Sequence, residues 1–192
     1  MQASLTVTMR GLNGVICHNS QLADPLNQYT RRLKSITSKR GKTDDDIIEG
    51  FKVEWEGGLY LNDKGEPIVP GLNIEALLRK AAAKLKAKGK VLSGIQVDED
   101  PKLEYDGPAT LEGLRPRWEE FSRRDIVRNP STGSRLPRCR PFFREWSLTY
   151  TISYNTEILD REKVEDIIRK TPEIGLLEWA PRFGRFEIVK IS

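Results

Sequence analysis

Apolar and polar side chains alternate along two long stretches of the chain. Residues 4–17 alternate until Gly11 and Gly14 interrupt the pattern, and residues 144–154 alternate throughout. A period of two residues is typical of a strand with one buried face, and glycines inside such a stretch favour a bend or a bulge. Both stretches are therefore predicted strands, and the shorter alternation over residues 186–191 predicts the last strand.

Four other stretches repeat their apolar residues every three to four positions, which is typical of helices that bury one face. They cover residues 25–40, 44–56, 74–88 and 161–171. A polar residue suited to capping a helix N-terminus precedes each of them. The predicted caps are Asp24, Thr43, Asn73 and Asp160.

The order of these elements predicts the fold class. Shorter strands or hairpins are predicted at residues 59–69, 95–97 and 103–105. The chain then runs strand–helices–hairpin–helix–strand, followed by strand–helix–strand. This order predicts an α+β fold of the ferredoxin-like or RRM-like type, with helices on one face of an antiparallel sheet. We expect a single domain over residues 1–192 with a helical insertion (about 22–56) and a basic hairpin or loop insertion (about 107–143).

Length and composition exclude several classes of protein. With 192 residues, 38% of them hydrophobic, the chain can bury a core, while no apolar run approaches the roughly 20 residues that a membrane span needs. The N-terminal residues lack the basic and then apolar layout of a signal peptide. Cys17 and Cys139 lack the spacing of a metal site and favour a reducing, cytoplasmic setting. Because His18 is the single histidine, we expect no metal and no cofactor.

The net charge of +4 is unevenly distributed. Residues 115–144 contain nine arginines, no lysine and three acidic residues, so this segment carries +6 and the rest of the chain −2. Arginine matches phosphate geometry and aromatic rings stack on bases, so the segment predicts contact with nucleic acid. The candidate contacts are Arg115, Arg117, Arg123, Arg124, Arg128, Arg135, Arg138, Arg140 and Phe142. Alternatively, the aromatic residues belong to the core and the arginines form a solvated, salt-bridged face.

A corner at residues 65–79, "GEPIVPGLNIEALLR", places an apolar pair between two prolines and then begins a helix. It resembles the motif G-x-P-x-[IV]-P-G-S-S-x-K-G-x-[LM]-R of the RAMP superfamily, which builds the backbone and accessory subunits of CRISPR effector complexes. The matching residues are Gly65, Pro67, Val69, Pro70, Gly71, Leu78 and Arg79. In that family the corner presents backbone amides and a lysine to the guide RNA. The resemblance implies RNA contacts at Asn73 and Arg79, while Glu75 stands at the lysine position.

The C-terminal residues 175–191, "GLLEWAPRFGRFEIVKI", resemble the glycine-rich loop of the same family. The resemblance implies that Arg182, Phe183 and Arg185 lie near phosphates, in a loop that nucleic acid can approach closely. The two motifs occur in the family's order, so we expect the proline corner and this loop to lie side by side as one cradle for a sugar-phosphate chain. The resemblance also implies that the arginine segment is a thumb that intrudes into a guide–target duplex.

Together these features predict a sequence-independent binder of single-stranded nucleic acid that assembles as a homo-oligomer without catalysis. RNA is the expected ligand, and the sequence leaves open whether it is RNA or DNA. The chain is shorter than most CRISPR backbone subunits, which favours a divergent stand-alone or phage-borne relative.

Two alternatives stay open. The first is an endoribonuclease, because His18 follows the first strand as the general base of the family's RNA-processing endonucleases does, and Asp44, Asp45 and Asp46 lie in the interval where type III subunits carry a cleavage-site aspartate. The same aspartates also suit a helix N-terminus. The second is a protein–protein module, such as an inhibitor or assembly factor on the same fold.

Overall fold

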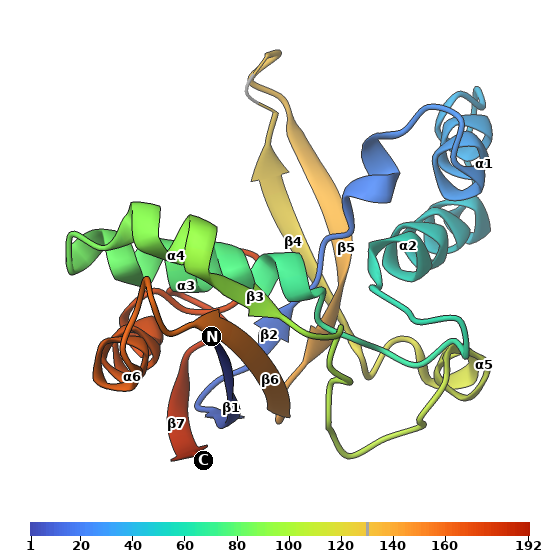
Figure 1. Cartoon of the computed structure of the whole chain (residues 1–192). Coiled ribbons are helices and arrows are strands. Elements are labelled where there is room, and N and C mark those ends of the chain that lie inside the picture. Colours follow the sequence, from blue (N-terminus) through green and yellow to red (C-terminus); the bar gives the residue numbers. More distant parts are fainter. Residues whose placement is uncertain (130) are drawn as a thin grey trace.

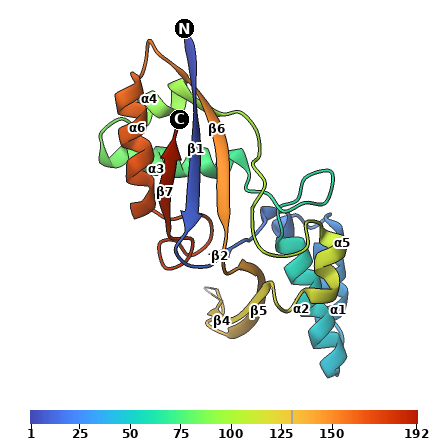
Figure 2. The ribbon, with the colours of Figure 1, turned by 90° about the horizontal axis from the view of Figure 1, so that it is seen from below.

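A four-stranded antiparallel sheet forms the centre of the computed structural model, which describes residues 1–129 and 131–192 (Figure 1). The strand order is β3-β6-β1-β7. The strands are β1 (Gln2–Gly11), β3 (Ile95–Val97), β6 (Ser147–Asn155) and β7 (Phe186–Ile191). β1 pairs with β6 on one side and with β7 on the other. The helices α3 (Gly71–Lys84) and α6 (Arg161–Lys170) pack on each other on one side of this sheet (Figure 2). This arrangement confirms the predicted ferredoxin-type α+β fold.

The core lies between this sheet and its helices. The alternating residues of β1 and β6 that we expected to be buried are buried, because a pleated strand turns every second side chain to the same face. From β1 and β6 they are Leu5, Val7, Met9, Leu148, Tyr150 and Ile152. The helices contribute Ile74 and Leu78 from α3 and Ile167 from α6. One continuous cluster of buried residues therefore joins the elements of both halves of the chain.

A second antiparallel sheet has the order β2-β5-β4. It consists of β2 (Val15–Ile16), β4 (Ser122–Arg128) and β5 (Arg135–Phe143). The predicted first strand is thus split at its glycines. A Cβ on Gly11 would lie 2.3 Å from the Trp146 ring and one on Gly14 would lie 2.2 Å from the Phe142 ring. Only glycine allows these two close approaches, where the chain passes from one sheet to the other.

The two predicted insertions pack on each other. Helices α1 (Gln28–Thr37) and α2 (Asp44–Gly58) gather with α5 (Leu111–Leu114) beside the β4–β5 hairpin, which projects away from the four-stranded sheet (Figures 1 and 2). Trp55 of α2 donates an indole N–H bond to the carbonyl of Phe121 at 2.9 Å. Trp118, Phe121 and Phe143 are buried, which confirms the alternative interpretation for these aromatic residues: they belong to the core.

Two of the four predicted helix caps are confirmed. Thr43 and Asp46 form a reciprocal capping box at α2, and Asp160 accepts a bond from the Lys163 N–H at the start of α6. The helix predicted to begin after Asp24 begins later, because Asn27 accepts the bond that caps α1. The remaining short elements are η1 (Ser20–Ala23), α4 (Lys88–Gly94), η2 (Arg115–Arg117) and η3 (Thr171–Glu173).

The predicted cap Asn73 is wrong, since α3 begins three residues earlier than predicted, at Gly71, with Pro70 in the cap position. Proline has no side-chain acceptor. The carboxylate of Asp100 fills this role from another loop by accepting the Gly71 N–H at 2.6 Å. The predicted extent of this helix to residue 88 is also wrong, because α3 ends at Lys84 and a separate helix, α4, begins at Lys88.

No helix in the described part of the chain is both long enough and apolar enough to span a membrane. Cys17 and Cys139 are buried, and neither forms a disulfide. Burial raises the pKa of Cys17 to about 12 and that of Cys139 to about 11, so both thiols stay protonated near neutral pH.

Candidate nucleic-acid interface

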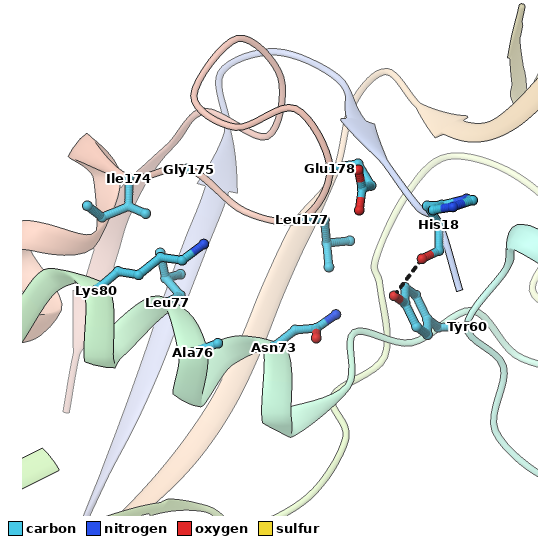
Figure 3. A pocket seen from close by; sticks show the side chains of 10 residues that line it. All are labelled: His18, Tyr60, Asn73, Ala76, Leu77, Lys80, Ile174, Gly175, Leu177 and Glu178. Atoms are coloured by element: carbon cyan, nitrogen blue, oxygen red, sulfur yellow. Dashed lines mark hydrogen bonds between the residues drawn. The ribbon is translucent and has the colours of Figure 1, made fainter. Parts of the chain in front are cut away.

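A cavity of about 170 Å³ lies between α3 and the C-terminal loop, residues 174–185 (Figure 3). We call it the α3 cavity. Asn73 and Lys80 line it from α3, Gly175 and Leu177 from the loop, and His18 and Tyr60 close one end. The helix that follows the proline corner and the C-terminal loop therefore lie side by side, as the two motifs predicted. Of the motif residues proposed for binding, Asn73 lines the cavity, while Arg79, Arg182, Phe183 and Arg185 do not.

The α3 cavity contains charged groups of both signs. Lys80 extends its amine toward the loop, and Glu178 lies beside His18 at the other end (Figure 3). Lys80 is exposed, whereas Lys84 on the same helix is paired with Glu173 at 3.2 Å. Sequence reasoning missed Lys80 because the family motif places its lysine at position 75. Glu75 instead accepts a hydrogen bond from the Val97 N–H at 3.1 Å and is engaged with β3.

The C-terminal loop keeps a glycine-like backbone without keeping the family's glycines. Gly175 and Gly184 have φ of 80° and 66°, and Leu177 and Trp179 also have positive φ, of 61° and 56°. Non-glycine residues seldom adopt this conformation, and each costs roughly 1–3 kcal/mol. With this backbone conformation, Leu177 lies in the wall of the α3 cavity and Trp179 lies against Arg140.

The end of this loop is held by Asn13. Its amide donates to the Arg182 carbonyl at 2.8 Å and its oxygen accepts from the Arg185 N–H at 2.8 Å. The side chains of Arg182 and Arg185 are exposed. The backbone of the predicted Arg-Phe-Gly-Arg turn is therefore rigidly attached to the crossing between the two sheets, while its arginines face solvent.

Arginine and aromatic side chains join the hairpin to the C-terminal loop. The Arg123 guanidinium lies 4.7 Å from the Phe183 ring centroid and 5.8 Å from that of Phe142, and Arg140 lies 4.7 Å from that of Trp179. Phe142 and Phe183 meet edge to face with centroids 5.9 Å apart. We call these five residues the arginine–aromatic cluster. It brings together three predicted binding residues, Arg123, Arg140 and Phe142, with Phe183 from the second motif.

Five of the nine arginines of the segment are neutralised by acidic residues. The pairs are Arg115–Glu56, Arg117–Glu120, Arg123–Asp125, Arg124–Glu119 and Arg138–Glu54. Two of the acidic partners come from α2, far away in sequence. For these five arginines the salt-bridged interpretation is therefore correct. Among the described residues, Arg128, Arg135, Arg140 and Arg144 form no ion pair.

The two pairs that reach α2 each combine a half-exposed arginine with a buried carboxylate, and the pair of Arg115 and Glu56 is one of them. Burial by itself would raise the pKa of Glu56, but hydrogen bonds and charge from Arg115 outweigh it and lower the pKa. The two guanidinium bonds measure 2.6 and 3.2 Å. Arg115 is thus engaged in holding α2 to the hairpin insertion. At the hairpin tip, Arg128 and Arg135 are opposite each other in register and exposed.

The candidate catalytic residues lie apart. His18 is half-buried in the α3 cavity wall, and burial, followed by the nearby Arg140 charge, lowers its pKa. Asp44 and Asp45 are exposed in the first turn of α2, and hydrogen bonds from Lys39 and Thr43 lower the pKa of Asp46. Within residues 1–129 and 131–192, no three His, Cys, Asp or Glu side chains are placed to hold a metal ion. The three aspartates form the first turn of α2, where carboxylates stabilise the helix N-terminus.

Comparison with known proteins supports the fold. The sequence matches no family model and no curated protein. Among solved structures, a chain of the cryo-EM structure of the type III-B Cmr-beta bound to cognate target RNA has a TM-score of 0.60 at 10% identity, with 100% of this chain and 60% of that chain covered. The crystal structure of Cmr6 from Pyrococcus furiosus has a TM-score of 0.43 at 10% identity, with coverages of 98% and 99%. The chain thus spans less than two thirds of the first of these, and that likeness supports the α+β fold.

Proposed function

We propose that this protein binds single-stranded RNA without sequence specificity, along the α3 cavity and the arginine–aromatic cluster. The observation that carries the proposal is the meeting of three segments: the face of α3 with Lys80, the strained C-terminal loop, and the base of the arginine hairpin. A structural neighbour that was solved bound to target RNA adds support.

The chemistry of this surface suits a nucleic-acid chain. Lysine and unpaired arginine attract phosphates, and partly exposed rings such as those of Phe142 and Trp179 can stack on bases. Asn73 and Tyr60 place an amide and a hydroxyl in the cavity, where a ribose 2′-hydroxyl can be recognised. We further propose that the protein works as a repeated subunit of a homo-oligomer, each copy binding a short stretch of the strand.

Binding of a fluorescein-labelled 20-nucleotide RNA, followed by anisotropy, tests the proposal. Each phosphate contact adds about 0.7 to the steepness with which the logarithm of the affinity falls against the logarithm of the salt concentration. Three to four contacts therefore predict a loss of affinity of about 20- to 50-fold between 50 and 200 mM salt. Light scattering on the same sample reports the oligomeric state. If the wild-type protein leaves the anisotropy of the RNA unchanged at 50 mM salt, RNA binding is refuted and the protein–protein module is favoured.

A matched pair of lysine variants locates the site. Lys80→Ala is expected to weaken binding about fivefold and to reduce the salt slope by about 0.7, since one phosphate contact is lost. Lys84→Ala removes the same charge from the same helix, but Lys84 is paired with Glu173 and lies outside the cavity. Equal effects of the two substitutions would show that α3 contributes only general charge.

One observation favours a second candidate, an endoribonuclease. His18 has a lowered pKa and is therefore neutral at pH 7, as a general base must be, and it shares the α3 cavity with Lys80 and Tyr60. Incubation of end-labelled RNA with wild type and with His18→Ala, in the presence of EDTA, separates the two functions. Cleavage by the wild type that the variant lacks establishes the enzyme, and intact RNA in both supports binding alone.

A further inference from the structure

A second hollow continues from the α3 cavity. A groove of about 400 Å³ runs between η1 and the β4–β5 hairpin, and we call it the hairpin groove. His18 lines both the α3 cavity and the hairpin groove, and Arg140 lines the groove beside it. The two hollows therefore share His18 in their walls, with Arg140 on the side of the hairpin groove.

Arg140 has no acidic partner at this junction. Two of its guanidinium nitrogens, Nε and Nη1, are buried and have no hydrogen-bond partner among the described residues. Glu54 is the acidic residue that lines the groove, and it is already engaged by Arg138 at 3.1 Å and by the Cys139 N–H at 2.9 Å. A guanidinium that is partly desolvated without an acceptor is costly, so the unpartnered nitrogens point to a ligand that supplies an acceptor.

The stacking of Arg140 on Trp179 orients this group. The guanidinium lies 4.7 Å from the indole centroid, so the ring fixes the position of the group. Trp179 adopts φ of 56° to reach this place. A strained residue that positions an unpaired arginine is typical of a binding site.

His18 supplies a second polar group at the same point. Its Nδ1 is buried and has no hydrogen-bond partner among the described residues. Burial and the Arg140 charge lower the pKa of His18, with Arg138 acting in the same direction and Glu178 and Glu54 in the opposite one. A neutral imidazole carries one N–H donor. Arg140 and His18 therefore both line the hairpin groove, and each has a buried nitrogen without a partner among the described residues.

We propose that Arg140 and His18 form a binding site for one phosphate group of the RNA backbone, at the point where the strand passes from the α3 cavity into the hairpin groove. The site rests on the proposed function and deepens it, because it assigns the path of the strand. The path runs along the hairpin side of the molecule, away from the outer face of the four-stranded sheet. That outer face is lined by hydroxyls, with Thr6 opposite Thr151 and Thr8 opposite Thr149.

Variants at Arg140 test the site with a labelled 12-nucleotide oligouridylate RNA. Arg140→Gln is expected to weaken binding about tenfold at 50 mM salt and to reduce the salt slope by about 0.7, because a single phosphate contact is lost. Arg140→Lys keeps the charge but loses the planar arrangement of donors. Its affinity for the RNA should lie between those of the wild type and Arg140→Gln. Arg161→Gln removes an equal charge from the exposed start of α6, where Arg161 is paired with Glu165, and should leave both quantities unchanged.

Nuclear magnetic resonance of the wild type gives a second measurement that no folding defect can obscure. His18 is the single histidine of the chain, so its imidazole signals need no assignment. Addition of the oligouridylate should shift them and raise the pKa of His18, because a phosphate stabilises the imidazolium form.

The outcomes separate the site from the proposed function. Loss of the contact in Arg140→Gln together with a shift of the His18 signals supports the site. Wild-type binding with unshifted His18 signals, or with an unchanged salt slope in a folded Arg140→Gln variant, overturns the site and leaves RNA binding intact. Failure of the wild type to bind the oligouridylate overturns both.

Discussion

The carboxylate of Asp100 accepts a hydrogen bond from the backbone N–H of Gly71 at 2.6 Å. This contact caps α3 from a loop that follows β3, and it places negative charge at the positive end of the helix dipole. A ligand phosphate therefore does not find the first amide of α3 free. The accessible part of this helix is its side, where Asn73 and Lys80 line the α3 cavity.

Removal of the remote cap should weaken the fold. Asp100→Ala is expected to lower the free energy of unfolding by about 1 kcal/mol, because the first N–H of α3 loses its acceptor. Urea denaturation followed by circular dichroism measures the change. Glu99→Ala, an exposed neighbour, should stay within about 0.5 kcal/mol of the wild type, and equal losses in both variants would show that the cap contributes nothing.

Loss of the Arg115 side chain should destabilise the protein in a pH-dependent way. Arg115→Gln leaves the buried Glu56 without its charged partner, and the expected loss at pH 7 is about 1–3 kcal/mol. Because the folded-state pKa of Glu56 lies below its ordinary value of 4.5, the pair stabilises the fold above that value. This stabilisation is lost as the pH falls through the folded-state pKa.

Urea titrations at pH 7 and at pH 3 measure this difference for Arg115→Gln. The gap in unfolding free energy between variant and wild type should be smaller at pH 3 than at pH 7, because lowering the pH drives protonation of the Glu56 carboxylate. Arg117→Gln breaks an exposed pair with Glu120 and should cost less than about 1 kcal/mol. A gap that is the same at both pH values contradicts the assignment to Glu56.

Gly184 should tolerate no side chain. Its φ is 66°, and a Cβ would lie 1.9 Å from the carbonyl oxygen of Leu176. Gly184→Ala is therefore expected to cost about 3 kcal/mol or more, from strain and a backbone clash together. Gly41 has nearly the same φ, 68°, with nothing near its Cβ position, so Gly41→Ala should cost only about 1 kcal/mol. If Gly184→Ala and Gly41→Ala lower the denaturation midpoint by the same amount, the close packing of Gly184 against Leu176 is contradicted.

Tyr150→Phe should leave the fold as stable as before or increase its stability by about 1 kcal/mol. The Tyr150 hydroxyl is buried and has no hydrogen-bond partner among the described residues, and burial raises its pKa far above the usual range. Tyr60→Phe is the contrasting variant, because it removes a bond of 3.0 Å to the His18 carbonyl and should cost about 1 kcal/mol. Thermal unfolding measures both, and a marked loss in Tyr150→Phe would reveal a hidden partner for the hydroxyl.

The amino-acid sequence by itself determined the elements of the fold and the order of its motifs. Alternation of apolar residues placed β1 and β6, and local capping chemistry placed the starts of α2 and α6 at Thr43 and Asp160. These features depend on neighbours a few residues apart, which a sequence displays directly. The approach of the proline corner to the C-terminal loop was also predictable, because the resemblance to a known family supplied it.

The tertiary structure alone decided which charges are free and which groups meet. Arg115 and Arg138 are neutralised by Glu56 and Glu54 from a helix more than fifty residues away, while Arg140 on the same strand as Arg138 is left unpaired beside His18. Lys80 lines the α3 cavity because the C-terminal loop, which lies about a hundred residues further along the chain, packs beside α3. Such partners come together only when the chain folds, since the energy of an ion pair depends on distance and burial in space and not on separation along the sequence.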